Sequence, residues 1–133
     1  MDIFTLDFET YYSKEYSLSK MTTEAYIRDQ RFEVIGVSVQ VNEDTPVWFS
    51  GKKFLKTFNW ENCAAIAHNA MFDMAILNWR FNIRPKKIID TLSMSRPFHM
   101  MDVGGSLKAL ATHYEIGAKG TEVLNAMGKK RLD

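Results

Sequence analysis

The sequence predicts an α/β domain in which helices flank a mixed β-sheet. Three observations lead to this class. Two β-branched segments joined by a short polar turn predict a hairpin. Short apolar runs then alternate with segments whose apolar residues recur at helical spacing. A hairpin followed by strand–helix–strand–helix is typical of a sheet with both antiparallel and parallel strands.

The elements can be justified in chain order. The first strand is apolar and ends in two acids, and the longest strand is rich in valine and alternates in part. Asn69 is placed to cap the helix that follows the apolar run 64–67, with Phe72 and Trp79 on its core face. The expected segments are strands at 3–10, 32–41, 46–49, 64–67 and 88–90, and helices at 22–29 (capped by Thr22 or Thr23), 52–58 (a short helix or turn), 69–79, 91–98 and 106–114 (capped by Gly105 or Ser106).

Composition limits the function classes. At 133 residues and 46% hydrophobic content, the chain is expected to be one globular domain, 1–133. No apolar run approaches the length of a membrane span, and no secretory signal precedes Ile3, so a cytoplasmic protein is expected. The single cysteine, Cys63, excludes an internal disulfide. A net charge of +1 argues against a broad DNA-wrapping surface.

The first strand ends in a pair of acids with a common orientation. Asp7 and Glu9 are two residues apart, so they point to one face of the strand, while Leu6 and Phe8 point to the other. These acids either flank a strand end in solvent or bind a divalent cation, which would offset their repulsion.

A third acid follows a later strand. Asp73 lies one helical turn after Asn69, and both would come close to Asp7 and Glu9 if the two strands were neighbours. Alternatively, Asp73 is a solvated acid that interacts with the helix dipole. His68 either contacts substrate or is a strand-end histidine with protein partners.

The ordered set of motifs resembles a known family. L-D-F-E-T (6–10) and A-H-N-A-M-F-D (67–73) are similar to the first two motifs of the DnaQ-like (DEDD) 3′→5′ exonucleases, and I-I-D-T-L (88–92) and G-G-S-L-K-A-L (104–110) look like the segments that follow. S-L-S-K-M-T-T-E-A-Y-I-R-D (17–29) and V-W-F-S-G (47–51) look like the N-terminal proofreading domain of phage-encoded family-A DNA polymerases. The resemblance covers nearly the whole chain.

The resemblance implies a fold, a reaction and a set of site residues. The fold would be RNase H-like, and the reaction would be metal-dependent hydrolysis of the terminal phosphodiester at a single-stranded DNA 3′ end. Asp7 would contact two divalent ions (Mg²⁺ or Mn²⁺), Glu9 one of them and Asp73 the other. The 3′-terminal nucleotide would meet the substrate-binding residues Phe8, Thr10, Asn69 and Phe72.

The sequence departs from the family in its third motif. That motif is Tyr-x-x-x-Asp or His-x-x-x-Asp on a late helix, and no Tyr or His here is followed by Asp four positions on. Asp90 and Asp102 are the candidates to replace the fourth acid, although neither lies in the expected context. We therefore expect a domain that lacks the last helix and is weak or inactive alone.

Three interpretations stay open at this point. The chain is a proofreading-type exonuclease domain, a non-catalytic module that binds single-stranded nucleic acid or a protein, or the N-terminal piece of a split DNA polymerase. The expected partners are a DNA 3′ end, a polymerase domain or polypeptide that supplies the missing helix, or a second copy of the chain in a homodimer.

Overall fold

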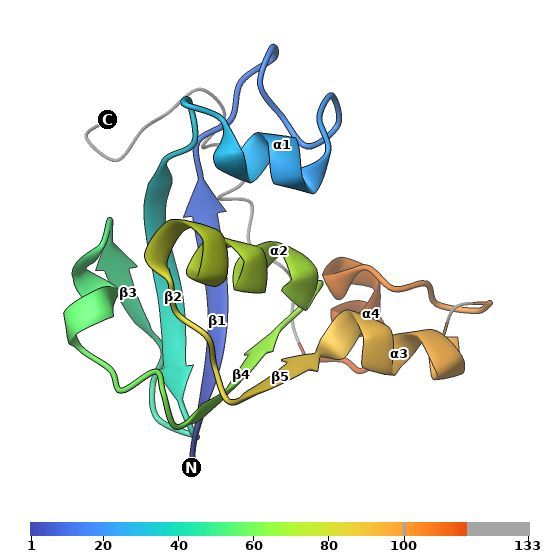
Figure 1. Ribbon diagram of the computed structural model, residues 1–133. Coiled ribbons are helices and arrows are strands. Elements are labelled where there is room, and N and C mark those ends of the chain that lie inside the picture. The colour runs from blue at the N-terminus through green and yellow to red at the C-terminus, as the bar shows by residue number, and fades with distance from the viewer. Residues whose placement is uncertain (100, 117–133) are drawn as a thin grey trace.

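A single mixed sheet organises the chain. The computed structural model describes residues 1–99 and 101–116, with five strands in the order β3-β2-β1-β4-β5 (Figure 1). β1 pairs antiparallel with β2, which pairs antiparallel with β3, whereas β4 is parallel to both β1 and β5. The predicted α/β class with a mixed sheet and flanking helices is confirmed. The strands are β1 Asp2–Thr10, β2 Val34–Val41, β3 Val47–Ser50, β4 Cys63–Ala67 and β5 Lys87–Asp90.

The helices lie close to their predicted positions. Thr22 and Ser106 cap α1 and α4 with their hydroxyl oxygens, which accept hydrogen bonds from Ala25 N at 3.1 Å and Ala109 N at 3.0 Å. In Figure 1, α2 lies in front of the sheet, α1 lies beyond the carboxyl end of β1, and α3 and α4 extend to one side beyond β5. The elements are α1 Thr23–Arg28, the 3₁₀ turn η1 Lys53–Lys56, α2 Ala70–Ala75, the π-type turn η2 Ile76–Arg80, α3 Thr91–His99 and α4 Leu107–His113.

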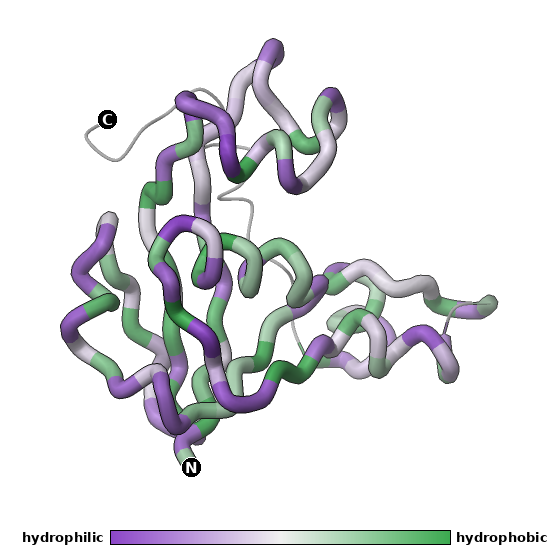
Figure 2. The backbone as a smooth tube through the Cα atoms, viewed as in Figure 1, coloured by the Kyte–Doolittle hydropathy of each residue, from purple (hydrophilic) through white to green (hydrophobic). Residues whose placement is uncertain are grey.

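The core lies on one face of the sheet. Along β1, Phe4, Leu6 and Phe8 are buried, and they belong to the same apolar cluster as Tyr26 and Ile27 of α1. Figure 2 shows the hydrophobic colour concentrated in α2 and along the central strands. Burying one such side chain contributes about 1.5–3 kcal/mol, so the alternation in β1 determines which face receives the helices.

The helix after β4 differs from its prediction. The apolar spacing predicted one helix to residue 79 with Trp79 in the core, but the α-helix ends at Ala75 and a π-type turn follows. A π turn places more residues in each turn, which shifts the register of every residue after Ile76. Trp79 is therefore 37% exposed, and Arg28 lies over its ring, 4.5 Å from the ring centroid.

No helix in the described part of the chain is long and apolar enough to cross a membrane.

Candidate active site

Asp7 and Glu9 lie near the carboxyl end of β1, on the face opposite the core. Asp7 is exposed and Glu9 is half-buried, while Phe8 between them is buried. The pairing of β1 with β4 extends only from Asp2 to Thr5, so β1 continues past the last paired residue. The two acids therefore stand on a stretch of β1 that β4 does not cover.

Asp73 of α2 reaches this stretch of β1. Its Oδ1 atom accepts a hydrogen bond from the Phe8 backbone N–H at 3.1 Å, and the side chain is only 4% exposed. The pKa of Asp73 is raised to about 8: burial is the largest cause, the negative charges of Asp7 and Glu9 act in the same direction, and the Phe8 hydrogen bond opposes them in part. The alternative of a solvated Asp73 is wrong, because the side chain is almost completely buried, and the charges of Asp7 and Glu9 act on it.

An open cleft of about 1140 Å³ runs along this end of the sheet. Of the residues predicted from sequence, it is lined by Asp7, Phe8, Glu9, Thr10, His68 and Phe72. The Phe8 side chain belongs to the core, so Phe8 faces the cleft mainly with its backbone. The cleft is not lined by Asn69, Asp73, Asp90 or Asp102. Asp73 is joined to the lining residue Phe8 by the hydrogen bond from the Phe8 backbone N–H.

The predicted capping role of Asn69 is wrong. Asn69 does occupy the N-cap position of α2, but its backbone is left-handed (φ 64°) and its side chain makes no capping hydrogen bond. Asp90, at the end of β5, accepts the Asn69 backbone N–H at 3.0 Å instead. The cap therefore comes from the neighbouring strand.

Asp90 also accepts hydrogen bonds from the first turn of α3. The donors to its carboxylate are Leu92 N and Ser93 Oγ, each at 3.0 Å. Desolvation raises the pKa of Asp90, but the hydrogen bonds from the backbone N–H of Ala70, from Ser93, Leu92 and Asn69 outweigh it, so the pKa lies below its ordinary value. Asp102, the other candidate for the fourth acid, is 67% exposed and lies 3.7 Å from His99 Nδ1.

His68 has protein partners on both ring nitrogens. Nδ1 lies 2.8 Å from Thr91 Oγ1, and Nε2 lies 2.7 Å from the Gly105 carbonyl oxygen. Because a carbonyl only accepts, Nε2 carries a hydrogen and donates. His68 thus ties the end of β4 to the starts of α3 and α4, as expected of a strand-end histidine with partners.

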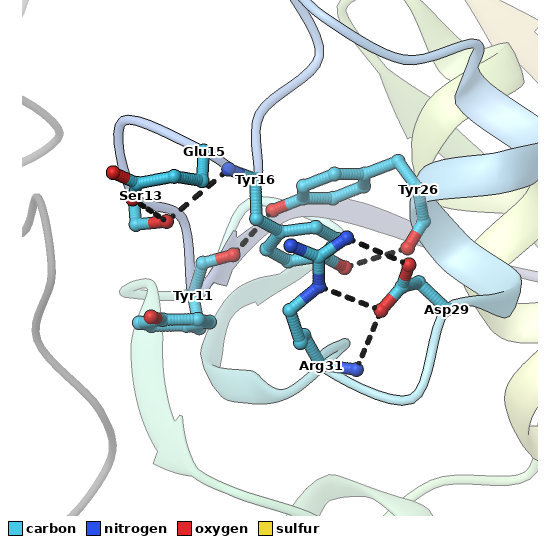
Figure 3. Close-up of polar contacts among 7 residues, drawn as sticks. All are labelled: Tyr11, Ser13, Glu15, Tyr16, Tyr26, Asp29 and Arg31. Atoms are coloured by element: carbon cyan, nitrogen blue, oxygen red, sulfur yellow. Dashed lines mark hydrogen bonds and ion pairs between the residues drawn. The ribbon is translucent and has the colours of Figure 1, made fainter.

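A tyrosine cluster supports the end of β1, and its role was not predicted from sequence. The Tyr26 hydroxyl donates to the Tyr11 carbonyl oxygen at 2.6 Å and lies 2.8 Å from Thr10 Oγ1. Tyr16 stacks on Tyr26 with ring centroids 4.5 Å apart and donates its hydroxyl hydrogen to the Tyr26 carbonyl oxygen (Figure 3). Tyr26 lies in the polymerase-like segment 17–29, but no motif marked it as a residue that holds Thr10.

The three acids fit a hard divalent cation by their chemistry. Asp73 is buried beside two other acids, so its negative charge is unfavourable unless the group binds a proton or a cation lies nearby. Carboxylate oxygens are ligands that Mg²⁺ and Mn²⁺ prefer. Within residues 1–99 and 101–116, no three His, Cys, Asp or Glu side chains already stand in position around one metal ion.

Comparison with solved structures finds proteins with a similar fold. Brucella melitensis NrnC with bound Mg²⁺ matches with a TM-score of 0.64 and 16% identity, covering 90% of this chain and 56% of that chain. Brucella melitensis NrnC bound to pGG matches with the same TM-score and sequence identity, covering 90% of this chain and 55% of that chain. An apo form of a nuclease matches with a TM-score of 0.65 and 16% identity, covering 91% of this chain and 56% of that chain. This chain thus spans little more than half the length of these proteins.

Sequence comparison gives the family. A search of curated proteins finds no match. The profile of a family described as 3′-5′ exonuclease matches residues 1–129, which is nearly the whole chain. The chain belongs to this 3′-5′ exonuclease family, within the DnaQ-like (DEDD) superfamily.

Proposed function

We propose that this chain is a proofreading-type 3′→5′ exonuclease domain that acts on the 3′ end of a single DNA strand. The observation that carries the proposal is the position of buried Asp73 against Asp7 and Glu9 at the wall of the cleft. Perturbed carboxyl groups beside a cleft are typical of catalytic sites. Membership of the 3′-5′ exonuclease family supports the reaction class.

Each acid has a distinct position in the proposed site. Asp7 and Glu9 line the cleft and would hold divalent cations on the substrate side, and Asp73 would contribute from behind the wall. Two such cations supply positive charge that stabilises the attacking and leaving oxygens of an in-line displacement. The Phe8 N–H keeps the Asp73 carboxyl oriented toward β1.

The cleft favours an unpaired strand end. It contains the aromatic and aliphatic side chains of Tyr12, Leu18 and Phe72, on which bases stack irrespective of sequence. Its volume of about 1140 Å³ is slightly above the range of about 300–1,000 Å³ that single-ligand pockets occupy, so it has room for more than one nucleotide. The neighbour bound to pGG supports this use of the fold for a short strand.

The site is expected to work weakly in this chain alone. No residue in the sequence matches the fourth acid of the family, and a missing ligand lowers the affinity for the ion that it shares. None of the residues of α3 and α4 is buried, and Phe98 is 77% exposed. We propose that a partner completes the site: a polymerase domain, a polypeptide with the third-motif helix or a second copy of the chain. The proposed location is inside the cell, which is the host cytoplasm if a phage encodes the protein.

A strand-degradation assay tests the proposal. With protein in excess over a single-stranded DNA labelled at its 3′-terminal nucleotide, Mn²⁺ should support release of labelled mononucleotide. Asp7→Asn should reduce the rate at least about 100-fold, because the charge of the cation ligand is lost. Asp44→Asn, at an exposed turn acid outside the cleft, is the matched control and should behave as wild type.

The second candidate is a non-catalytic module that captures strand ends or a protein. The absence of a fourth acid, and of a preformed three-ligand group in the described residues, favours it. The same assay separates the two candidates. No release at any protein concentration, together with strand binding that Asp7→Asn leaves unchanged, would overturn the exonuclease proposal. A split polymerase is tested by searching the downstream reading frame for a Tyr-x-x-x-Asp helix.

A further inference from the structure

Trp48 of β3 lies on the same face of the sheet as Asp7 and Glu9, which we call the acid face. In antiparallel strands, residues directly opposite each other point to the same side. Asp7 is opposite Ser38 of β2, and Ser38 is opposite Trp48 (β1, β2 and β3 in Figure 1). Neighbouring strands are about 4.8 Å apart, so two strand spacings, about 10 Å, separate the Trp48 backbone from that of Asp7.

The Trp48 ring reaches back toward the acids. A Cβ atom on Gly36 would lie only 2.2 Å from Trp48 Cζ2 and 2.7 Å from Trp48 Cη2, so the ring occupies the space above this glycine. Gly36 is directly opposite Glu9, which places the ring about one strand spacing from Glu9. The strands that line the cleft are β1 and β4, and no residue of β2 or β3 is among its described lining residues. The ring therefore lies just outside the rim of the cleft.

Trp48 is supported on one side and open to solvent on the other. The residue is 50% exposed, although its ring rests on the Gly36 backbone. Phe98 and Tyr114 are more exposed, but they belong to α3 and the end of α4, beyond the opposite edge of the sheet (Figure 1). A ring that the protein already holds in place binds a planar partner with little further loss of entropy.

The acid face is uncharged between the acids and Trp48. Ser38 separates Asp7 from Trp48, and Ser50 is directly opposite Gly36. Serine hydroxyl groups donate hydrogen bonds to phosphate and sugar oxygens, and they do not repel a polyanion. A protein helix packed on this face would instead bury Asp7 and Ser38, which is unfavourable unless each finds a polar partner. One flat ring on a polar surface therefore suits a nucleic acid strand better than a polypeptide.

We infer that the Trp48 indole stacks on a base of the single-stranded substrate outside the cleft, upstream of the 3′-terminal nucleotide. The inference rests on the proposed function, because Asp7 and Glu9 then fix the position of the terminal nucleotide. The strand leaves the cleft across Ser38 toward the ring. An aromatic ring stacks on any base, so Trp48 increases the affinity for the strand without selecting its sequence.

Strand binding without cleavage tests the inference. The Asp7→Asn protein in EDTA is titrated into (dT)8 labelled at its 5′ end with a dye, and fluorescence anisotropy gives the Kd. Adding Trp48→Ala should weaken binding about tenfold, which is about 1.4 kcal/mol and within the range for one stacked base. Trp48→Phe keeps a ring and should recover most of the affinity. Trp79→Ala, at a partly exposed tryptophan of η2, is the matched control and should bind as tightly as the parent.

A direct contact is visible in the ¹⁵N-indole NMR signals. The Trp48 signal, assigned with the Trp48→Phe variant, should shift when (dT)8 is added. The signal of buried Trp60 should stay in place, and its presence in each variant shows that the protein is folded. The inference is overturned if (dT)8 leaves the Trp48 signal in place, or if Trp48→Ala leaves the Kd unchanged. A changed sedimentation coefficient of Trp48→Ala with an unchanged Kd would identify the acid face as a protein contact and would also overturn it.

The release of labelled mononucleotide decides the proposed function separately. If (dT)8 binds through Trp48 but the wild type releases no mononucleotide, the exonuclease proposal fails and the stacking contact stands. If mononucleotide is released and the Kd does not depend on Trp48, the inference alone fails.

Discussion

Asp73 combines almost complete burial with two acidic neighbours. Its carboxyl group keeps a proton to about pH 8, because burial and the charges of Asp7 and Glu9 disfavour the ionised form. A divalent cation can take the place of that proton. The pH dependence of folding reports on this group in the absence of metal.

Stability should fall as the pH rises from about 4 to 8 in EDTA. In this window the folded state holds the Asp73 proton and the unfolded state, with its ordinary pKa of 3.8, has lost it. The free energy of unfolding should decrease by at most about 1.4 kcal/mol per pH unit and then level off. Urea unfolding at several pH values measures the slope. Asp73→Asn, which cannot ionise, should remove it, and an identical slope in that variant would contradict the assignment.

Asp90 should prove structural rather than metal-binding. Asp90→Ala removes the acceptor for Asn69 N, Leu92 N and Ser93 Oγ at once, so we expect a loss of about 2–4 kcal/mol in the free energy of unfolding. Asp90→Asn keeps one acceptor oxygen and should lose less. Urea unfolding measures both variants. If Asp90→Asn instead weakened Mn²⁺ binding with little change in stability, Asp90 would be the replacement for the fourth acid.

At the scale of elements, periodicity predicted most of the sheet but not the details of the helix after β4. The alternation in β1 and the hairpin of β2 and β3 depend on local patterning, and both are observed. The backbone N–H of the left-handed Asn69 is bound by Asp90, twenty-one residues away, and the apolar spacing of the segment gave no sign of the π-type turn at Ile76. A contact between residues so far apart in the sequence cannot be predicted from local spacing.

Gly36 marks a close contact between β2 and β3. A Cβ atom there would lie 2.2 Å from Trp48 Cζ2 and 2.6 Å from the Phe49 carbonyl oxygen. Gly36→Ala should therefore destabilise the fold by about 1–3 kcal/mol, as measured by thermal or urea unfolding. Adding Trp48→Ala should recover only part of this loss, since the Phe49 carbonyl remains. Full recovery in the double variant would show that the strand backbone is free to shift.

At the scale of the molecule, the ordered motifs predicted the family, and the strand order explains why the acids meet. Asp7 and Asp73 are far apart in sequence, and they come together only because β4 pairs beside β1 and leads into α2. The sequence suggested this convergence but could not show that Asp73 is buried, or that Phe8 N–H holds it. A second, smaller pocket, lined by residues 32–34, 51–52 and 79–81, could not be predicted from the sequence either, because its walls come from three separate segments.

The central claim is that Asp7, Glu9 and Asp73 form a divalent cation site. Direct titration with Mn²⁺ at pH 8, with free Mn²⁺ measured by electron paramagnetic resonance, tests it without requiring catalysis. The wild type and the exposed-acid control Asp44→Asn should bind Mn²⁺ with the same affinity. Asp7→Asn and Asp73→Asn should each bind at least about tenfold more weakly, since each loses a charged ligand. Equal Mn²⁺ affinity in all four proteins would contradict the claim.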